Sequence, residues 1–346
     1  MAGPRGESLA RTYDLLMFDL DGVVYVDGHA VEHAAESIAD AREGGAHIAF
    51  ITNNASRPPE QVASNLRELG VHADPEDVVT SSQAAARVLL ETYGEGSRIA
   101  VLGADGLVAA LREAGLEPVR VGDPEAVAVV SGYAPDLRWR VIMRAATLIR
   151  NGLPWVATNT DLTLKTGDGL APGHGLLVRL ISDFAQVTPQ VAGKPLRPLL
   201  DETRRRVEGE RPLMVGDRLD TDIAGAHQAE TDSLLVMTGV SSLSDLLTAG
   251  PDERPTWIGQ DLRALTRPGC RPARTEDGWR AGAWTARVDD GRMTVTGADG
   301  DAGTDPGGAD AWWTAVAAAG WDHLDRSGTP ADPGGLTGPE GAASPG

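Results

Sequence analysis

The sequence predicts an α/β protein with a Rossmann-like parallel sheet, a second α/β unit inserted into it and a small C-terminal extension. Three short apolar runs each end in polar residues, as buried parallel strands do. A helical pattern follows the second run over residues 58–69, and alternation of strands and helices favours a parallel sheet covered on both faces. The three runs are Leu15–Phe18, Ile48–Ile51 and Pro212–Val215.

The spacing of these strands predicts the inserted unit. Asp19 and Thr52 follow their strands directly, and Asp217 follows the third strand after Gly216. The first two of these residues are 33 positions apart, whereas the last two are 165 apart. The second gap holds predicted strands and helices of its own, so we expect a small α/β cap. We expect the domains to be the core (1–80 and 188–262) and the cap (81–187). Within the cap we predict strands over 98–103, 126–131 and 154–158 and helices over 106–115 and 138–151.

The composition changes after residue 262. Five of the eight tryptophans lie beyond it, together with abundant Gly, Asp and Pro. We predict a small α+β unit over 263–326, with a hairpin that pairs 278–288 with 292–296 and a helix over 309–319. Residues 327–346 are expected to be a disordered tail.

Charge and cysteine content exclude several classes of protein. A net charge of −19 argues against nucleic acid and anionic membranes as partners, because both would be repelled. The single cysteine, Cys270, excludes an intramolecular disulfide and a cysteine zinc cluster. The chain shows neither a signal peptide nor a transmembrane stretch, so we expect a cytoplasmic protein. A homodimer is left open.

Two carboxylates at the end of the first strand are the candidate catalytic pair. Asp19 and Asp21 point the same way along the pleat, and Gly22 permits a sharp exit from the strand. Attack of a carboxylate on a phosphate dianion requires a hard cation with oxygen ligands, for which Mg²⁺ is the candidate and Asp217 a further ligand. Asp21 can then act as acid and base.

The residues after the second strand, together with Lys194, supply groups for binding a phosphoryl group. Thr52, Asn53 and Asn54 offer hydroxyl and amide donors to its oxygens. Lys194 is one of only two lysines among 31 basic residues, which favours a specific role as the positive charge. Pro195 is expected to open the helix that follows.

Asp222 lies in the segment that ends the third strand, and two roles stay open for it. It can hold a metal-bound water or orient Lys194, or it can simply cap a helix.

These motifs together resemble those of a known family. The segments DLDGVVY, ITNNAS, GKP and GDRLDTDIAGA, in this order over residues 14–262, are similar to the four motifs of haloacid dehalogenase phosphatases. The resemblance implies Asp19 as nucleophile and Asp21 as acid and base. It also implies Mg²⁺ bound by the Asp19 and Asp217 side chains and the Asp21 carbonyl, with phosphate contacts from residues at the second and third motifs, namely Thr52, Asn53 and Lys194.

The inserted unit resembles a class IIA cap. The family's usual proline-glycine-asparagine-glycine turn reads Pro172-Gly173-His174-Gly175 here, and Asp161 and Lys165 are candidate substrate contacts from the cap. Relatives with this cap include nucleotide, phosphoglycolate, pyridoxal-phosphate and glycerol-phosphate phosphatases. The layout of core, cap and extension resembles actinobacterial glycerol 3-phosphate phosphatases, so glycerol 3-phosphate is the favoured small phosphorylated substrate.

Other functions are weighed against this one. His29, Glu32 and His33 match the H-x-x-E-H zinc pattern, which needs both histidines on one helical face. A receiver domain also uses an acceptor aspartate, but lacks the large insertion. A binding role for the tryptophan-rich extension is a third alternative. Asp105 is expected to cap a cap-domain helix rather than to react.

Overall fold

The computed structural model describes residues 6–166, 169–207, 209–297, 306–336 and 338–339. The chain forms two compact units. Unit 1 comprises residues 1–48, 69–71 and 208–346, and unit 2 comprises residues 49–68 and 72–207. Among the described residues, no helix has the length and apolar character that crossing a membrane requires.

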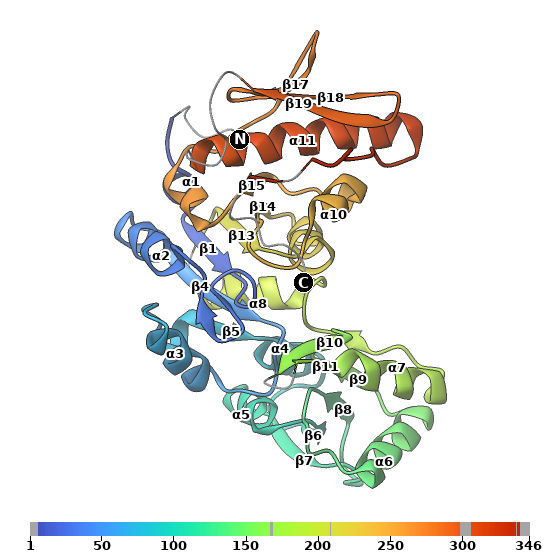
Figure 1. Cartoon of the computed structure of the whole chain (residues 1–346). Coiled ribbons are helices and arrows are strands. Elements are labelled where there is room, and N and C mark those ends of the chain that lie inside the picture. Colours follow the sequence, from blue (N-terminus) through green and yellow to red (C-terminus); the bar gives the residue numbers. More distant parts are fainter. Residues whose placement is uncertain (1–5, 167–168, 208, 298–305, 337, 340–346) are drawn as a thin grey trace. The chain divides into compact units, whose positions relative to one another are not determined.

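The centre of unit 1 is a parallel sheet built on the predicted first and third strands (Figure 1). β1 pairs with β13, so that Met17 lies opposite Met214, and β14 and β15 follow on the other side of β13. Every residue of β1 and β13 is buried, which agrees with a sheet covered on both faces. The strands are β1 (Leu15–Phe18), β13 (Pro212–Gly216), β14 (Asp232–Val236) and β15 (Trp257–Gly259).

Short helices and a small hairpin complete this part of unit 1. α2 buries Ala34, Ile38 and Ala41, which recur at helical spacing on one face. Ser242 and Asp245 form a capping box at the start of α10. The helices are α1 (Leu9–Thr12), α2 (Ala34–Glu43), α9 (Ala224–Gln228) and α10 (Leu243–Thr248), with single turns over Leu219–Ile223, Pro251–Glu253 and Leu262–Thr266 and a hairpin of β2 (Tyr25–Val26) and β3 (His29–Ala30).

Strand β4 (His47–Thr52) begins in unit 1 and continues into unit 2. Its first N–H, that of His47, donates to the Asp14 carbonyl just before β1. In unit 2 it pairs in parallel with β5 (Val78–Thr80). The predicted second strand is therefore confirmed. The predicted helix over 58–69 is also confirmed as α3 (Pro59–Glu68), and a turn over Pro75–Asp77 leads into β5.

Unit 2 contains a second parallel sheet, which confirms the predicted α/β character of the insertion. Its strand order is β12-β9-β8-β6-β7. The strands are β6 (Arg98–Leu102), β7 (Glu117–Arg120), β8 (Ala128–Ser131), β9 (Trp155–Ala157) and β12 (Gln190–Val191), and an antiparallel hairpin joins β10 (Thr163–Thr166) to β11 (Gly169–Pro172). The helices are α4 (Ser81–Tyr93), α5 (Asp105–Glu113), α6 (Trp139–Arg150), α7 (His174–Ala185) and α8 (Pro198–Arg206).

Two local predictions in unit 2 were wrong. Asp105 is the first residue of α5, and the residue at the cap position is Ala104. Pro195 lies in a turn, and the helix begins at Pro198, which takes the first helical position in its place. Proline favours that position wherever it occurs, so sequence alone did not distinguish the two prolines.

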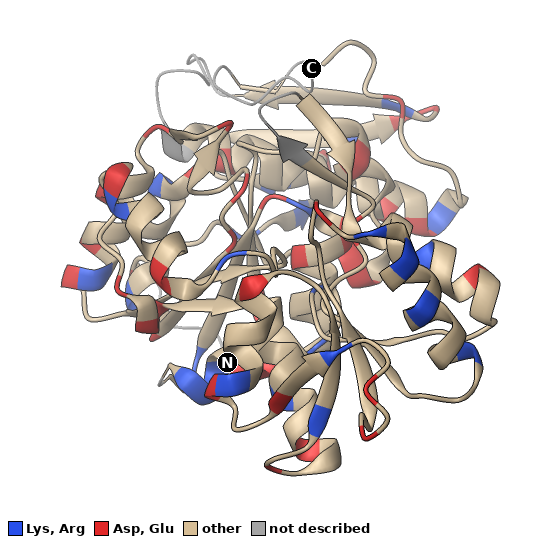
Figure 2. Ribbon diagram, turned by 90° about the horizontal axis from the view of Figure 1, so that it is seen from below, with Lys and Arg blue, Asp and Glu red and all other residues tan. Residues whose placement is uncertain are grey.

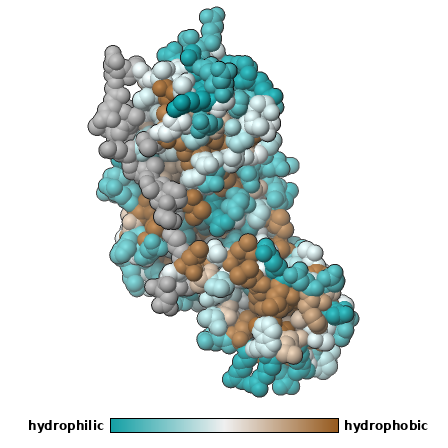
Figure 3. Space-filling view, turned by 45° about the vertical axis from the view of Figure 1, so that its right-hand side comes forward, coloured by the Kyte–Doolittle hydropathy of each residue, from teal (hydrophilic) through white to brown (hydrophobic). Residues whose placement is uncertain are grey.

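Helices α6 and α7 carry exposed apolar side chains. Trp139 and Met143 on α6 are 61% and 56% exposed, and Leu180 and Phe184 on α7 are 40% and 47% exposed. Hydrophobic residues gather at the lower end of Figure 3, where Figure 1 places these helices. The Arg150 guanidinium lies over the Phe184 ring, 5.1 Å from its centre.

Lys and Arg are interspersed with Asp and Glu along the helices and loops drawn in Figure 2. Many pair within one helix, as Arg87 and Glu91 do at 2.7 Å and Arg326 and Asp322 do at 2.7 Å. The excess of acidic residues is thus distributed over many elements.

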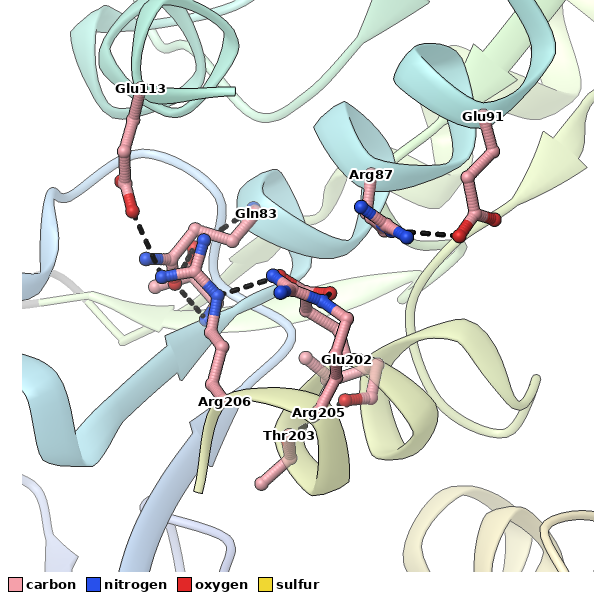
Figure 4. A network of polar contacts seen from close by, with 10 residues as sticks. Gln83, Arg87, Glu91, Glu113, Glu202, Thr203, Arg205 and Arg206 are labelled. Atoms are coloured by element: carbon pink, nitrogen blue, oxygen red, sulfur yellow. Dashed lines mark hydrogen bonds and ion pairs between the residues drawn. The ribbon is translucent and has the colours of Figure 1, made fainter. Parts of the chain in front are cut away.

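A buried carboxylate ties α8 to α5 (Figure 4). Glu202 accepts hydrogen bonds from Arg205 at 2.7 and 2.8 Å and from Arg206 at 2.6 Å. Arg206 also donates to Glu113 of α5 at 2.9 Å. Burial acts to raise the pKa of Glu202, but the two arginines outweigh it and hold the pKa below its usual range.

The C-terminal extension is an antiparallel sheet covered by one long helix (Figure 1). It shares one hydrophobic cluster with the parallel sheet and α10. Trp313 donates to Gln260 and Trp321 donates to the Leu246 carbonyl, both at 2.7 Å, which anchors the helix to the rest of unit 1. The elements are β16 (Ala273–Thr275), β17 (Gly278–Ala281), β18 (Trp284–Asp289), β19 (Arg292–Gly297) and α11 (Pro306–Ser327).

Predictions for the extension were confirmed in part. The hairpin across Asp289 and Arg292 and the helix are present. The predicted strand over 278–288 is instead two antiparallel strands that reverse at Gly282, which has φ +53°. The prediction of a disordered tail from residue 327 was wrong for its first residues, because Asp332 exchanges backbone hydrogen bonds with Gly291 and Met293. Residues 340–346 lie outside the described part.

Candidate active site

The end of β1 positions the two candidate catalytic carboxylates. The N–H of Asp19 donates to the Val215 carbonyl at 2.9 Å, which continues the pairing of β1 with β13. The chain then turns, because the N–H groups of Val24 and Tyr25 both donate to the Leu20 carbonyl. Asp19 is therefore half-buried at the strand end, whereas Asp21 is exposed on the turn.

Asp19, Asp217 and Asp222 form a cluster of carboxylates in unit 1. Each offers an oxygen that lies within 4.8 Å of the others'. Asp217 and Asp222 are fully buried. Hard divalent cations such as Mg²⁺ prefer carboxylate oxygens, and burying several carboxylates together is costly without a compensating charge. This donor set fits a magnesium ion. The Asp21 side chain is not part of the cluster.

Two glycines make room for the Asp217 carboxylate. A Cβ atom on Gly22 or on Gly239 would overlap the Asp217 side chain. Gly22 also has φ +88°, a conformation that favours glycine. The N–H of Val240 donates to Asp217 Oδ2 at 2.6 Å, which fixes that oxygen. Asp217 is therefore held by backbone groups on either side.

Asp222 holds the loop that carries Asp217. Its Oδ2 atom accepts hydrogen bonds from the N–H groups of Asp217 and Arg218, both at 3.1 Å. The predicted alternative of a helix cap was wrong, because Asp222 lies within the turn over Leu219–Ile223 and Arg218 takes the cap position. The carboxylate cluster places Asp222 close to the candidate metal site. Asp220 points elsewhere and pairs with Arg218 at 2.7 Å.

The candidate phosphate-binding residues lie in unit 2. Thr52 ends β4 and is buried, and its hydroxyl oxygen accepts from the Asn54 N–H at 3.0 Å. Asn54 is exposed, and its side-chain oxygen accepts from the N–H and hydroxyl of Ser56. The Asn54 side chain thus shapes the loop after β4.

Asn53 and Lys194 are brought together although 141 residues separate them. The Asn53 side chain accepts from the Lys194 N–H at 2.9 Å and donates to the Lys194 carbonyl at 3.0 Å. Lys194 is only 2% exposed. Its neighbour Gly193 packs so closely that a Cβ atom would lie 2.5 Å from Asn53 Oδ1 and 2.6 Å from the Thr158 carbonyl.

Asp161 joins this cluster, and sequence reasoning missed a further member. Asn53 donates to Asp161 Oδ1 at 3.2 Å. Asn159, which was not predicted, donates to the Asn53 carbonyl at 2.6 Å and accepts from the Asp161 N–H at 3.1 Å. The segment after β9, Thr158-Asn159-Thr160-Asp161, is rich in residues that bond to nearby backbone, and this was the available signal. Lys165 lies on β10, and its side chain is outside the described part.

The zinc alternative is contradicted by the fold. His29 belongs to β3, and His33 precedes α2 with a left-handed φ of 65°. The Glu32 side chain is 88% exposed. The three residues therefore do not share one helical face, which the H-x-x-E-H pattern requires.

Comparisons with known proteins identify the family. Residues 16–117 match the family model of haloacid dehalogenase-like hydrolases, and residues 191–265 match a second, HAD-hydrolase-like model. A D-glycerol 3-phosphate phosphatase of Mycobacterium tuberculosis is 42% identical over 259 residues, which are 75% of this chain and 72% of that protein. The chain belongs to the haloacid dehalogenase-like hydrolases. It is a phosphatase of this family, that is, a phosphoric monoester hydrolase.

Other relatives and solved structures agree. An acid sugar phosphatase of Staphylococcus aureus is 34% identical, and the match covers 73% of this chain and 96% of that protein. Crystal structures of a glycerol phosphate phosphatase from M. tuberculosis, in complex with calcium and with magnesium, match with a TM-score of 0.82 and 38% identity. The calcium complex covers 92% of this chain and 91% of that chain. Residues 1–262 are too few to supply 92% of 346 residues, so the match includes part of the C-terminal extension.

Proposed function

We propose that this haloacid dehalogenase-like phosphatase hydrolyses glycerol 3-phosphate to glycerol and phosphate, with Mg²⁺ and a covalent aspartyl phosphate on Asp19. The choice of glycerol 3-phosphate as substrate is supported by the structural match to a glycerol phosphate phosphatase at 38% identity, which includes part of the extension. The relative of 42% identity is named for the same substrate.

The proposed reaction begins at Asp19. A carboxylate oxygen of Asp19 attacks phosphorus, and the bond from phosphorus to the glycerol oxygen breaks. Asp21, protonated at this stage, gives its proton to the leaving alkoxide. Its exposure on the turn supports this role, since a group that exchanges protons with leaving alcohol and water must be accessible.

The second half of the reaction frees the enzyme. Asp21, now ionised, takes a proton from a water molecule that attacks phosphorus, and the bond from phosphorus to the Asp19 oxygen breaks. Phosphate is released and Asp19 is restored. Magnesium, when bound by Asp19, Asp217 and the Asp21 carbonyl, supplies positive charge that offsets the repulsion between carboxylate and phosphate.

We assign phosphate contacts to Thr52, Asn53, Asn54 and Lys194. The fixed backbone of Lys194 supports this assignment, because both of its polar groups bond to the Asn53 side chain and so hold the lysine beside a second assigned residue. Asp222 is assigned to the support of the Asp217 loop, which its two backbone hydrogen bonds favour.

A second candidate substrate is a sugar phosphate, which the S. aureus relatives favour. Phosphoglycolate, pyridoxal phosphate and nucleoside monophosphates stay on the panel, because the class IIA resemblance covers phosphatases for all of them.

Phosphate release from this panel, with Mg²⁺ and with a chelator, tests the proposal. We expect glycerol 3-phosphate to give the highest kcat/KM and the chelator to abolish turnover. A higher kcat/KM for a different substrate would contradict the assignment of glycerol 3-phosphate. Full activity in the presence of the chelator would contradict the magnesium requirement.

A further inference from the structure

His174 occupies the first position of α7, where the cap turn departs from the family pattern. The residue is buried, with 3% exposure. On either side of it, the N–H of Gly173 donates to the Leu162 carbonyl and that of Gly175 to the Asp161 carbonyl, both at 2.8 Å. A Cβ atom on Gly175 would overlap the Thr160 carbonyl. The start of α7 is thus packed directly against residues 160–162.

The imidazole of His174 belongs to a chain of buried hydrogen bonds with one consistent direction. Trp155 Nε1 donates to Ser131 Oγ at 2.8 Å. Ser131 Oγ lies 3.2 Å from His174 Nε2, and His174 Nδ1 lies 2.9 Å from the Asn159 carbonyl. A carbonyl can only accept, so Nδ1 carries the proton, and Nε2 then accepts from the Ser131 hydroxyl. All of these groups are satisfied only in this arrangement.

The acceptor of this chain, Asn159, reaches the candidate phosphate-binding cluster. Its side chain donates to the Asn53 carbonyl at 2.6 Å and accepts from the Asp161 N–H at 3.1 Å. Asn53 in turn bonds to both backbone polar groups of Lys194. Three hydrogen bonds therefore connect His174 Nδ1 to the Lys194 backbone through Asn159 and Asn53.

We propose that His174 is a positioning residue for phosphate binding: its Nδ1–H fixes Asn159, and Asn159 holds the Asn53 loop that clamps Lys194. The inference rests on the proposed function, because it assigns Asn53 and Lys194 to the phosphoryl group. His174 would then influence substrate affinity although it bonds to Asn159 and not directly to Asn53 or Lys194.

A purely packing role for His174 is the alternative, and two substitutions separate the roles. His174→Asn puts an amide nitrogen where Nδ1 stands, so it retains the donor but leaves space where the ring was. His174→Leu fills most of that space without any donor. A positioning role predicts that Asn resembles the wild type more closely, and a packing role predicts that Leu does.

The measurements are kcat and KM for glycerol 3-phosphate and the Kd of inorganic phosphate, by calorimetry with Mg²⁺ present. For His174→Leu we expect KM and Kd to rise roughly tenfold, as loss of one buried hydrogen bond implies. We expect kcat to change much less, because the same contact acts before and during the reaction. His174→Asn should stay within about threefold of the wild type.

A smaller effect of His174→Leu than of His174→Asn would overturn the proposal, as would equal constants for all three proteins. If the leucine variant does not fold, His174→Gln replaces it, because its amide reaches toward Ser131 and leaves the Asn159 carbonyl without the donor. If the wild type turns over no substrate but binds phosphate, the proposed function fails and the Kd values alone decide the role of His174. If the wild type binds no phosphate, both fail.

Discussion

The Asn53 side chain bonds to both backbone polar groups of Lys194, accepting from its N–H at 2.9 Å and donating to its carbonyl at 3.0 Å. An amide that satisfies both groups of one residue fixes the rotation of that residue as well as its position. The Lys194 side chain therefore leaves a backbone that the loop after β4 holds in place.

Gly193→Ala should weaken phosphate binding. The new methyl group would lie 2.5 Å from Asn53 Oδ1, so the clamp on Lys194 must open. We expect the Kd of inorganic phosphate to rise roughly tenfold, the effect of about one lost hydrogen bond. The control is Gly250→Ala, since nothing lies within 4 Å of a Cβ atom there and φ is −69°. Equal Kd values for both variants would show that the clamp is unimportant.

Gly22→Ala should weaken magnesium binding. Gly22 has φ +88° and a Cβ atom there would overlap the Asp217 carboxylate, whereas Gly28 has φ +80° and open space. Alanine at either position costs about 1 kcal/mol of backbone strain, but only at Gly22 does it displace Asp217. We expect the Mg²⁺ concentration for half-maximal activity to rise at least about tenfold in Gly22→Ala. A similar rise in Gly28→Ala would assign the effect to strain.

Glu202→Gln should destabilise the protein. The Glu202 side chain is 2% exposed, and the partly exposed Arg205 and Arg206 donate to it. The amide loses these charge-assisted hydrogen bonds and buries an NH2 group that faces donors only. We expect a loss of about 3 kcal/mol in the free energy of unfolding. Glu113→Gln removes the partly exposed partner of Arg206 and should cost less than about 1 kcal/mol. Denaturant titration measures both, and equal losses would contradict the importance of burial.

His174 should make stability depend on pH. Burial lowers the pKa of His174 from 6.5 to about 4, and the groups bonded to its ring are uncharged. Between these values the unfolded chain binds a proton that the folded protein excludes, so stability falls as the pH drops from about 6.5 to 4. The loss from this residue is roughly 3 kcal/mol.

Comparison with His174→Asn isolates this contribution, because other groups titrate equally in both proteins. The stability advantage of the wild type over the variant at pH 7.5 should shrink by that amount at pH 4. An advantage that is the same at both pH values would show that the buried imidazole does not titrate as expected.

Much of the core could be predicted because the candidate catalytic residues stand next to the apolar runs that form its strands. Apolar runs such as Leu15–Phe18 carry their polar residue at the strand end, and in parallel sheets such ends gather on one edge. The candidate metal ligands Asp19 and Asp217 follow from this rule, and the structure places them in one carboxylate cluster.

What the sequence did not predict depends on contacts between distant residues. The bond from Asn159 to Asn53 spans 106 residues and that from Asn53 to Lys194 spans 141. The sequence around a loop asparagine does not indicate which distant residue it will hydrogen-bond. The strand break at Gly282 was missed for a similar reason, because a glycine within an apparent strand predicts a bulge as readily as a reversal.

The most direct test of the account is the rate of phosphate release from glycerol 3-phosphate by Asp19→Asn, with Asp40→Asn on the surface of α2 as the control. The account predicts a loss of at least about 10³-fold for Asp19→Asn, since the asparagine amide is not a nucleophile, and wild-type rates for Asp40→Asn. Substantial turnover by a verified Asp19→Asn protein would contradict an aspartyl phosphate on Asp19.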